Sequence, residues 1–460
     1  MAVDVGLPRP TPDPRSLALP IALLAPVLGI AAVISPAAAL IAVAALLFVA
    51  VAFYDLAAGV ALFTTFTFLE ALPAAGGDVE AVKVGGFVLV LAALRRSGRP
   101  FLLKEQPKLA YAATFFAGWA LASTLWAANV SPAAADGVRL LLDVALVFVV
   151  FAAVRQARDA RWIVWGYVAG ATAAALVGLV QPADNDRLVG SLGEPNFLAA
   201  MLLPAFVFTV FATGWTTNVV QRWLVRLLGV LFLVSIFLTQ SRGGLIALVV
   251  VIVAGVVLGG PRRRIFALVG GVAAAVGLAY YALFASDYAL ERLTNPGRGT
   301  GRADLWSVAT GVIGDNPVVG VGAGNFPVVA PQYAAEPINL PYARLLVDTP
   351  KVAHNTYLGV FAELGVVGLA LFALIVVGSL VLLWRAVEVF ARRGDVQLEL
   401  IGRAILVSLA GMLTAFVFLS GEYEKQLWLL LGLAVALHGL ARRRARTTGE
   451  RRIEPLPSRR

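Results

Sequence analysis

Long apolar runs and short polar connections alternate along almost the whole chain. We predict helical spans at about residues 17–34, 37–54, 58–74, 82–94, 109–127, 138–154, 162–180, 196–213, 223–239, 244–259, 265–285, 356–384, 399–419 and 427–441. Most of these runs approach the roughly 20 residues that a helix needs to cross a bilayer. The third and fourth are the weakest, because they are short and Glu70 lies among them. The pattern therefore predicts 12–14 spans in an all-α, polytopic transmembrane helix bundle.

The composition agrees with a membrane protein, because 60% of the residues are hydrophobic and only 14% are charged. A transmembrane barrel would show short strands of alternating polarity, and the sequence contains no such pattern. The chain has no cysteine, which excludes disulfides, thiolate metal sites and a cysteine nucleophile.

The basic residues follow the connections in alternation. Lysines and arginines are concentrated in 95–108, 155–161, 261–264 and the tail from 442 onward, and are sparse in the connections between these. The excess of lysine and arginine in cytoplasmic loops places the basic connections and both termini in the cytoplasm. The net charge of +10 is thus explained by topology, and we expect no nucleic-acid partner. Residues 17–34 are longer than a signal-peptide core, so we expect a retained anchor.

This topology divides the chain into five parts. They are a cytoplasmic segment (1–16), a transmembrane bundle of about eleven spans (17–285), an extracytoplasmic loop (286–353), a bundle of about three spans (354–441) and a basic cytoplasmic tail (442–460). The loop is too long for an idle connection, and GRADLWSVATGVIGDNP within it has helical spacing.

Polar residues gather where three helices are expected to begin on the outer side. Arg187 and Asn196 flank the start of the span at 196–213, Arg242 stands before the span at 244–259, and His354 with Asn355 precedes the span at 356–384. A helix N-terminus carries unpaired N–H groups and a partial positive charge, so these starts form an anion site if they converge. The alternative is that each arginine is an anchor at the membrane surface.

The long loop adds Arg302 and the glycine-rich segment VVGVGAGNF (318–326), which contains Gly322 and Asn325. Arginine suits a diphosphate, because its planar fork donates two parallel hydrogen bonds. The glycines permit a phosphate cradle, but turn formation is the favoured interpretation, since the lysine and serine or threonine of a nucleotide loop are missing.

His354 is one of two histidines in the chain. Beside a helix N-terminus and arginines its pKa should be lowered, which keeps the imidazole neutral and able to accept a proton. We interpret His438, in the last span, as a packed side chain. Glu363 lies on the other side of the helix from His354, so we expect it to bind a neighbouring helix or loop. Asp143 is either a contact between helices or part of a relay, and we favour the contact.

The segments HNTYLGVFAELGVVGL, SRGG, RLVGSLGEPNFLA and GRADLW…NPVVGVGAGNF resemble the four signature regions of the O-antigen ligase and polymerase superfamily. The resemblance implies a bacterial inner-membrane glycosyltransferase that needs no metal or cofactor. Its donor is an undecaprenyl-pyrophosphate-linked glycan, and its acceptor is the hydroxyl of a glycan, lipid or protein. By motif, the essential residues of the family correspond to Arg242, Arg302 and His354, and Arg187 to the arginine before the PN motif. Glu194 stands where many relatives have another residue.

Two other functions remain open at this stage. A transporter or flippase tends to carry its binding residues near the midplane of broken helices, whereas here they gather at the outer boundary. A scaffold of an envelope complex would tolerate replacement of all these residues. Within the superfamily, the sequence does not distinguish a polymerase, a ligase and a protein oligosaccharyltransferase.

Overall fold

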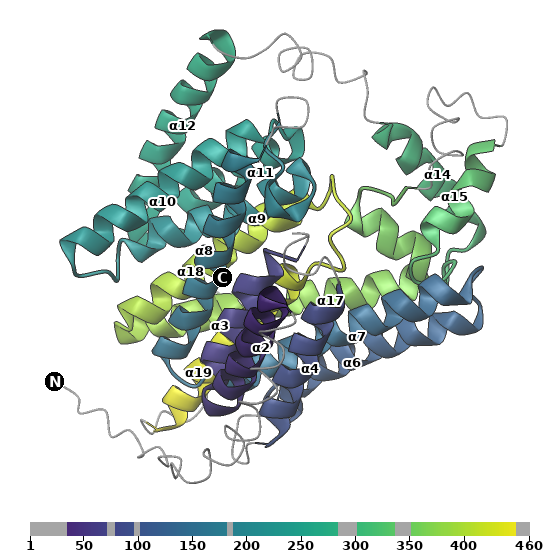
Figure 1. Cartoon of the computed structure of the whole chain (residues 1–460), viewed down its shortest axis with the longest axis horizontal. Helices are drawn as coiled ribbons and strands as arrows, with labels where there is room; N and C mark the ends of the chain where they lie inside the picture. Colours follow the sequence, from purple (N-terminus) through teal and green to yellow (C-terminus); the bar gives the residue numbers. More distant parts are fainter. Residues whose placement is uncertain are drawn as a thin grey trace, which may run out of the picture.

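The computed structural model describes residues 35–70, 79–95, 102–181, 187–283, 301–335 and 351–447. These residues form an all-helical bundle without a β-strand, which confirms the predicted fold class. Figure 1 shows the helices packed side by side, with α14 and α15 set apart from α10–α12.

The longer helices of the bundle have these bounds: α2 Pro36–Tyr54, α3 Leu56–Thr67, α4 Val79–Arg95, α6 Pro107–Ala122, α7 Val130–Ala153, α8 Ala157–Val180, α9 Pro195–Ala212, α10 Val219–Leu238, α11 Arg242–Leu258, α12 Arg263–Leu283, α17 Thr356–Arg393, α18 Val396–Ala415 and α19 Lys425–Thr447. Each coincides with one predicted span. The remaining predicted span, 17–34, lies outside the described residues. The apolar pattern therefore located each of these longer helices.

Among the described helices, five are long and apolar enough to cross a membrane, or six if α11 and α12, bent by 114°, form one broken span. Others fall short in length, such as α4 with 17 residues and α6 with 16. The chain is thus a multi-span membrane protein, and the total of 12–14 spans stays a prediction.

The connections alternate between two ends of the bundle. At one end, which we call the basic end, Arg158 pairs with Asp55, Arg443 with Glu105 and Arg444 with Asp395. At the opposite end, called the site end, Lys425 pairs with Glu70 at 2.8 Å and Asn325 donates to the carbonyl of Asn129. This separation matches the predicted division of the connections into basic and non-basic sets.

The described part of the long loop packs as a small unit on α17. Its helices are α14 (Arg302–Asp315), the predicted helical segment, and α15 (Phe326–Ala335), which the sequence analysis did not single out. They share a second apolar core with α17, made of Leu305, Val308, Ala309, Val312, Val321, Phe326, Val329, Ala330, Ala334, Ala353 and Ala362. Burial of these side chains holds the loop against the site end.

Helix α17 is interrupted at Gly365, whose φ of +67° is not helical. The break frees backbone groups that the loop then satisfies. Val321 N–H donates to the carbonyl of Ala362 at 3.0 Å, and Val366 N–H donates to the carbonyl of Pro317 at 2.9 Å. A Cβ at Gly365 would collide with the carbonyl of Val318, so a residue without a side chain is required here.

Candidate functional site

The starts of α9 and α11 meet through Arg187. Its Nε donates to the carbonyl of Thr239 at 3.0 Å, and a terminal guanidinium nitrogen donates to Asn196 Oδ1 at 3.2 Å. Asn196 in turn donates to Glu194 Oε1 at 2.6 Å. Arg187 thus bridges the residues before α11 to the first turn of α9.

Helix α11 begins with Arg242, and Ser241 is its N-cap, accepting from Gly244 N–H at 3.1 Å. Gln240, the residue before Ser241, has a φ of +49°. This left-handed conformation is energetically unfavourable for any residue that carries a side chain. Helix α11 packs closely against α9 at this turn, because a Cβ on Gly244 would come within 2.7 Å of the Ala199 methyl on α9. Gly244 of SRGG therefore lets the starts of α9 and α11 approach each other.

His354 stands immediately before the N-cap of α17. The N-cap, Asn355, accepts from Tyr357 N–H at 3.0 Å and Leu358 N–H at 3.1 Å, so its side chain holds the first turn. His354 has a φ of +47°. Among the described residues, His354 and Gln240 are the non-glycine positions with positive φ. Both precede helices at the site end, where backbone strain of this kind is typical of functional sites.

The imidazole of His354 is half-buried, and its Nδ1 is enclosed without a hydrogen-bond partner in the described parts of the chain. Burial lowers its pKa below the ordinary 6.5; Arg302 and Lys351 lower it too, whereas Glu194 acts in the opposite direction. The pKa is lowered, as predicted, but the largest cause is burial, not the arginines and the helix N-terminus that the prediction named. Because Glu194 is the N-cap of α9 and Arg302 begins α14, the starts of both helices lie within electrostatic reach of His354.

Arg302 is the first residue of α14, and Gly301 before it is left-handed with a φ of +54°. The turn between α18 and α19 (416–424) joins this helix to the others. Phe418 stacks on Trp306 of α14 with ring centroids 6.3 Å apart, and a Cβ on Gly243 of α11 would come within 2.9 Å of the Phe418 Cβ. The same turn is fixed to α17, because Thr356 N–H donates to the carbonyl of Phe416 at 3.0 Å and Thr356 Oγ1 donates to that of Leu419 at 2.8 Å.

Packing contacts therefore link the segments that carry Arg187, Arg242, Arg302 and His354 to one another. Neighbouring members of this set are more than fifty positions apart in the sequence. The helix N-termini carry partial positive charge, which acts together with the charge of the guanidinium groups. Cations and helix N-termini of this kind suit an anion, and burial lowers the pKa of the His354 imidazole among them.

The glycine-rich loop uses its polar groups inside the protein. Gly322 N–H donates to the Glu363 carbonyl at 2.8 Å, and Gly324 N–H donates to the Glu363 carboxylate at 2.8 Å. Asn325 is fully buried and hydrogen-bonded on both sides to Asn129. Substrate binding by Gly322 and Asn325 stays a prediction, and the observed contacts hold the loop on α17.

Glu363 and His438 occupy the places expected for them. The Glu363 carboxylate also accepts from Phe326 N–H and, at 2.9 Å, from Tyr423 Oη, so it binds a neighbouring loop and turn. His438 is buried, with Nδ1 3.0 Å from the Leu382 carbonyl.

The segment GEYEK (421–425) lies at the centre of the site end, although none of the predicted site residues belongs to it. Glu422 is buried beside the first turn of α17, where its Oε1 would come within 3.1 Å of a Cβ on Gly359. Burial raises the pKa of Glu422, and the neighbouring Glu363 raises it further. The sequence does mark this segment, because four titratable side chains in five residues are unusual in a chain with 14% charged residues.

Comparison with known families gives a match in this region. Residues 227–373 match the family model described as O-antigen ligase. This segment is an O-antigen ligase domain. The domain contains Arg242, Arg302 and His354, whereas Arg187 and Asn196 come before it. A search of curated proteins found none that matches this chain. The resemblance inferred from the motifs is thereby confirmed for the part of the chain from α10 to the first half of α17.

Proposed function

We propose that this O-antigen ligase family protein is a glycosyltransferase of the ligase or polymerase type. It moves a glycan from an undecaprenyl-pyrophosphate carrier to an acceptor hydroxyl at the extracytoplasmic face of the membrane, without a metal ion. The observation that carries the proposal is the meeting of Arg187, Arg242, Arg302 and His354 at the starts of four helices.

The cations suit a diphosphate leaving group. As the bond to the sugar breaks, negative charge grows on the diphosphate, and positioned guanidinium and N–H donors stabilise it. Arg242 and Arg302 supply this stabilisation, and Arg187, held by Asn196 and Thr239, completes the pocket. Asn355 fixes the α17 start beside it.

His354 acts as the base. The acceptor oxygen forms a bond to the anomeric carbon while the bond from that carbon to the diphosphate oxygen breaks, and the diphosphate leaves with the electron pair. The hydroxyl proton moves to the imidazole, which its lowered pKa keeps neutral at physiological pH. A single displacement of this kind inverts the configuration of the sugar.

A nearby carboxylate assists the base. Glu194 lies within electrostatic reach of His354 and stabilises the imidazolium that forms. Its own place is set by the hydrogen bond from Asn196 at 2.6 Å.

The extracytoplasmic location follows from the charge pattern. The basic end gathers the lysine- and arginine-rich connections, which favour the cytoplasm, so the site end faces outward. No nucleotide sugar is present there, which makes a lipid-linked diphosphate the reasonable donor.

The decisive test incubates the purified full chain with a lipid-pyrophosphate-linked glycan and a hydroxyl acceptor. A longer or transferred glycan supports the proposal, whereas a transporter or flippase would leave every covalent structure unchanged. The glycan of a deletion strain then separates the subclasses: single-unit chains indicate a polymerase, and unattached lipid-linked polymer indicates a ligase.

A further inference from the structure

Two aromatic rings lie between the segments that carry the candidate site residues. Trp306 is on α14, four positions after Arg302, so the two side chains share one face of that helix. Phe418 is in the turn 416–424, and its ring centroid lies 6.3 Å from that of Trp306, with the ring planes tilted by 32°. This aromatic pair, Trp306 and Phe418, therefore joins the start of α14 to the turn between α18 and α19.

Phe418 also lies against the start of α11. A Cβ on Gly243, the residue after Arg242, would come within 2.9 Å of the Phe418 Cβ and 3.1 Å of two of its ring carbons. The turn on either side of Phe418 accepts two hydrogen bonds from Thr356, which stands two positions after His354. The aromatic pair is thus bordered by the starts of α11, α14 and α17.

Packing within the protein does not account for both rings. Each residue is half-buried, so part of its surface stays exposed. Phe418 belongs to neither of the two apolar cores that the described residues form. Trp306 packs against the second core, yet its Nε1 is enclosed without a hydrogen-bond partner in the described part of the chain. Because an unpaired buried donor costs free energy, phenylalanine or leucine would serve better here if packing were the only role.

The ring of a sugar matches an aromatic surface at this place. One face of a pyranose ring presents C–H groups that carry partial positive charge, and the face of an aromatic ring is electron-rich. The hydroxyls of the sugar project from the rim of the ring and stay hydrated. A diphosphate is bonded directly to the first sugar, so arginines at the starts of α11 and α14 that hold the diphosphate place this sugar beside the aromatic pair.

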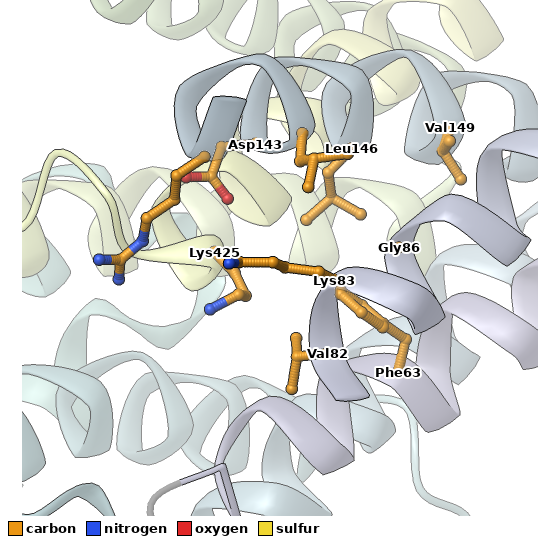
Figure 2. A pocket seen from close by; sticks show the side chains of 10 residues that line it. Phe63, Val82, Lys83, Gly86, Asp143, Leu146, Val149 and Lys425 are labelled. Atoms are coloured by element: carbon orange, nitrogen blue, oxygen red, sulfur yellow. The ribbon is translucent and has the colours of Figure 1, made fainter. Parts of the chain in front are cut away.

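A small cavity in the same part of the bundle offers no room for a sugar. Figure 2 shows it between α4, α7 and α19, with Lys83, Asp143 and Lys425 around it. Its volume of about 30 Å³ is enough for water and too small for a pyranose. A sugar therefore needs a more open surface, such as the one beside Trp306 and Phe418.

We propose that Trp306 and Phe418 form the surface on which the sugar attached to the diphosphate lies, with the C–H face of that sugar against aromatic carbon. This assignment rests on the proposed function and adds to it the residues that recognise the transferred sugar. Stacking fixes the plane of the sugar ring, and with it the direction in which the anomeric carbon faces the acceptor hydroxyl. The cations and the base act on any sugar, whereas the aromatic pair selects one whose ring has an uninterrupted C–H face.

Equilibrium binding of two ligands separates the sugar from the rest of the donor. One ligand is a polyprenyl diphosphate that carries one sugar, and the other is the same polyprenyl diphosphate without a sugar. Both are measured by native mass spectrometry on the purified full chain, without acceptor. Trp306→Leu keeps an apolar side chain but removes the aromatic face. We expect it to weaken binding of the sugar-bearing ligand about five- to tenfold and to leave binding of the sugar-free ligand unchanged.

Three further variants complete the comparison. Trp306→Phe should retain most of the affinity, because an aromatic face remains, and Phe418→Leu should act in the same direction as Trp306→Leu. The matched control is Trp162→Leu, the same substitution at a 52% exposed tryptophan of the basic end, which should change neither affinity. In the transfer reaction, Trp306→Leu should raise KM for the donor and leave KM for the acceptor unchanged.

Equal weakening of both ligands by Trp306→Leu would mean that the rings hold the lipid or only shape the site, and would overturn the proposal. So would unchanged binding of both ligands, or a loss in Trp306→Phe as large as that in Trp306→Leu. If neither leucine variant folds, saturation-transfer NMR on the wild-type chain decides the question. Saturation of aromatic protons should reach the C–H protons of the sugar ring, and no transfer to them refutes the stacking.

The proposed function fails on a different observation. A wild-type chain that transfers no glycan to any hydroxyl acceptor refutes the reaction, whereas a wild-type chain that transfers glycan while Trp306→Leu binds the donor as tightly refutes only the role of the aromatic pair.

Discussion

At the scale of single residues, the site end depends on side chains held in uncommon backbone conformations. His354, with a φ of +47°, sits one position before the N-cap of α17, and Gln240, with a φ of +49°, stands just before the N-cap of α11. Such conformations persist only where the surroundings impose them. Here the surroundings are the caps Asn355 and Ser241 and the turn 416–424.

Removal of the base or of a cation should abolish transfer and leave the fold intact. We expect His354→Ala to lower the transfer rate by about 10²- to 10⁴-fold, the usual contribution of a general base. Arg302→Ala should have a comparable effect, because one donor to the leaving group is lost. The measurement is transfer by purified variants, with the amount of folded protein in the membrane as control. A near-normal rate for His354→Ala would refute the base assignment.

The pH dependence follows from the lowered pKa of His354. The imidazole must be neutral to accept a proton, so activity should persist at mildly acidic pH and fall only as the pH passes below a pKa that lies under 6.5. Glu194 raises this pKa, so Glu194→Gln should move the acid limb of the kcat/KM profile to still lower pH. An acid limb that is unchanged in Glu194→Gln, or that moves upward, contradicts the proposed interaction.

At the scale of elements, the glycine-rich loop docks at the break in α17. Gly365 interrupts the helix, and the backbone of 317–322 hydrogen-bonds to the groups that the break exposes. Glu363 completes the docking by accepting from Gly324 and Phe326 N–H groups. The element that carries Arg302 is thereby placed beside the element that carries His354.

This docking predicts a difference between two glycines that share a positive φ but differ in ψ, which is −172° at Gly365 and 20° at Gly394. Gly365 and Gly394 have φ values of +67° and +69°, but a Cβ at Gly365 meets the loop backbone whereas one at Gly394 meets nothing within 4 Å. Gly394→Ala should cost about 1 kcal/mol of backbone strain. Gly365→Ala should cost a further 1–3 kcal/mol, through overpacking and through a φ/ψ combination that is open almost only to glycine, and should also lower activity. Thermal unfolding in detergent compares them, and equal Tm values would contradict the docking.

At the scale of the whole molecule, the connections divide between two ends of one bundle. Ion pairs such as Arg443 with Glu105 collect at the basic end, and the polar site residues collect at the other. A division of this kind is what a membrane imposes, because positive loops are retained on the cytoplasmic side.

The proposed orientation can be tested with two matched cysteine variants, since the chain has no cysteine of its own. Thr310 on α14 and Thr217 in the connection between α9 and α10 are both exposed, one at each end. In intact cells, a membrane-impermeant thiol reagent should label Thr310→Cys and should label Thr217→Cys only after permeabilisation. The reverse pattern would place the site end in the cytoplasm and refute an extracytoplasmic reaction.

The sequence by itself determined the helices and their alternation between two ends, and it supplied the cations of the proposed site. Apolar periodicity and charge density are local properties, so 38-residue α17 and the segment before it with His354 could be read from the chain directly. The contact partners of Glu363 and the central place of GEYEK could not, because they depend on loops that fold back across 39 positions from Gly324 and 60 positions from Tyr423. Only tertiary packing decides which helix starts meet and which buried atoms stay unpaired.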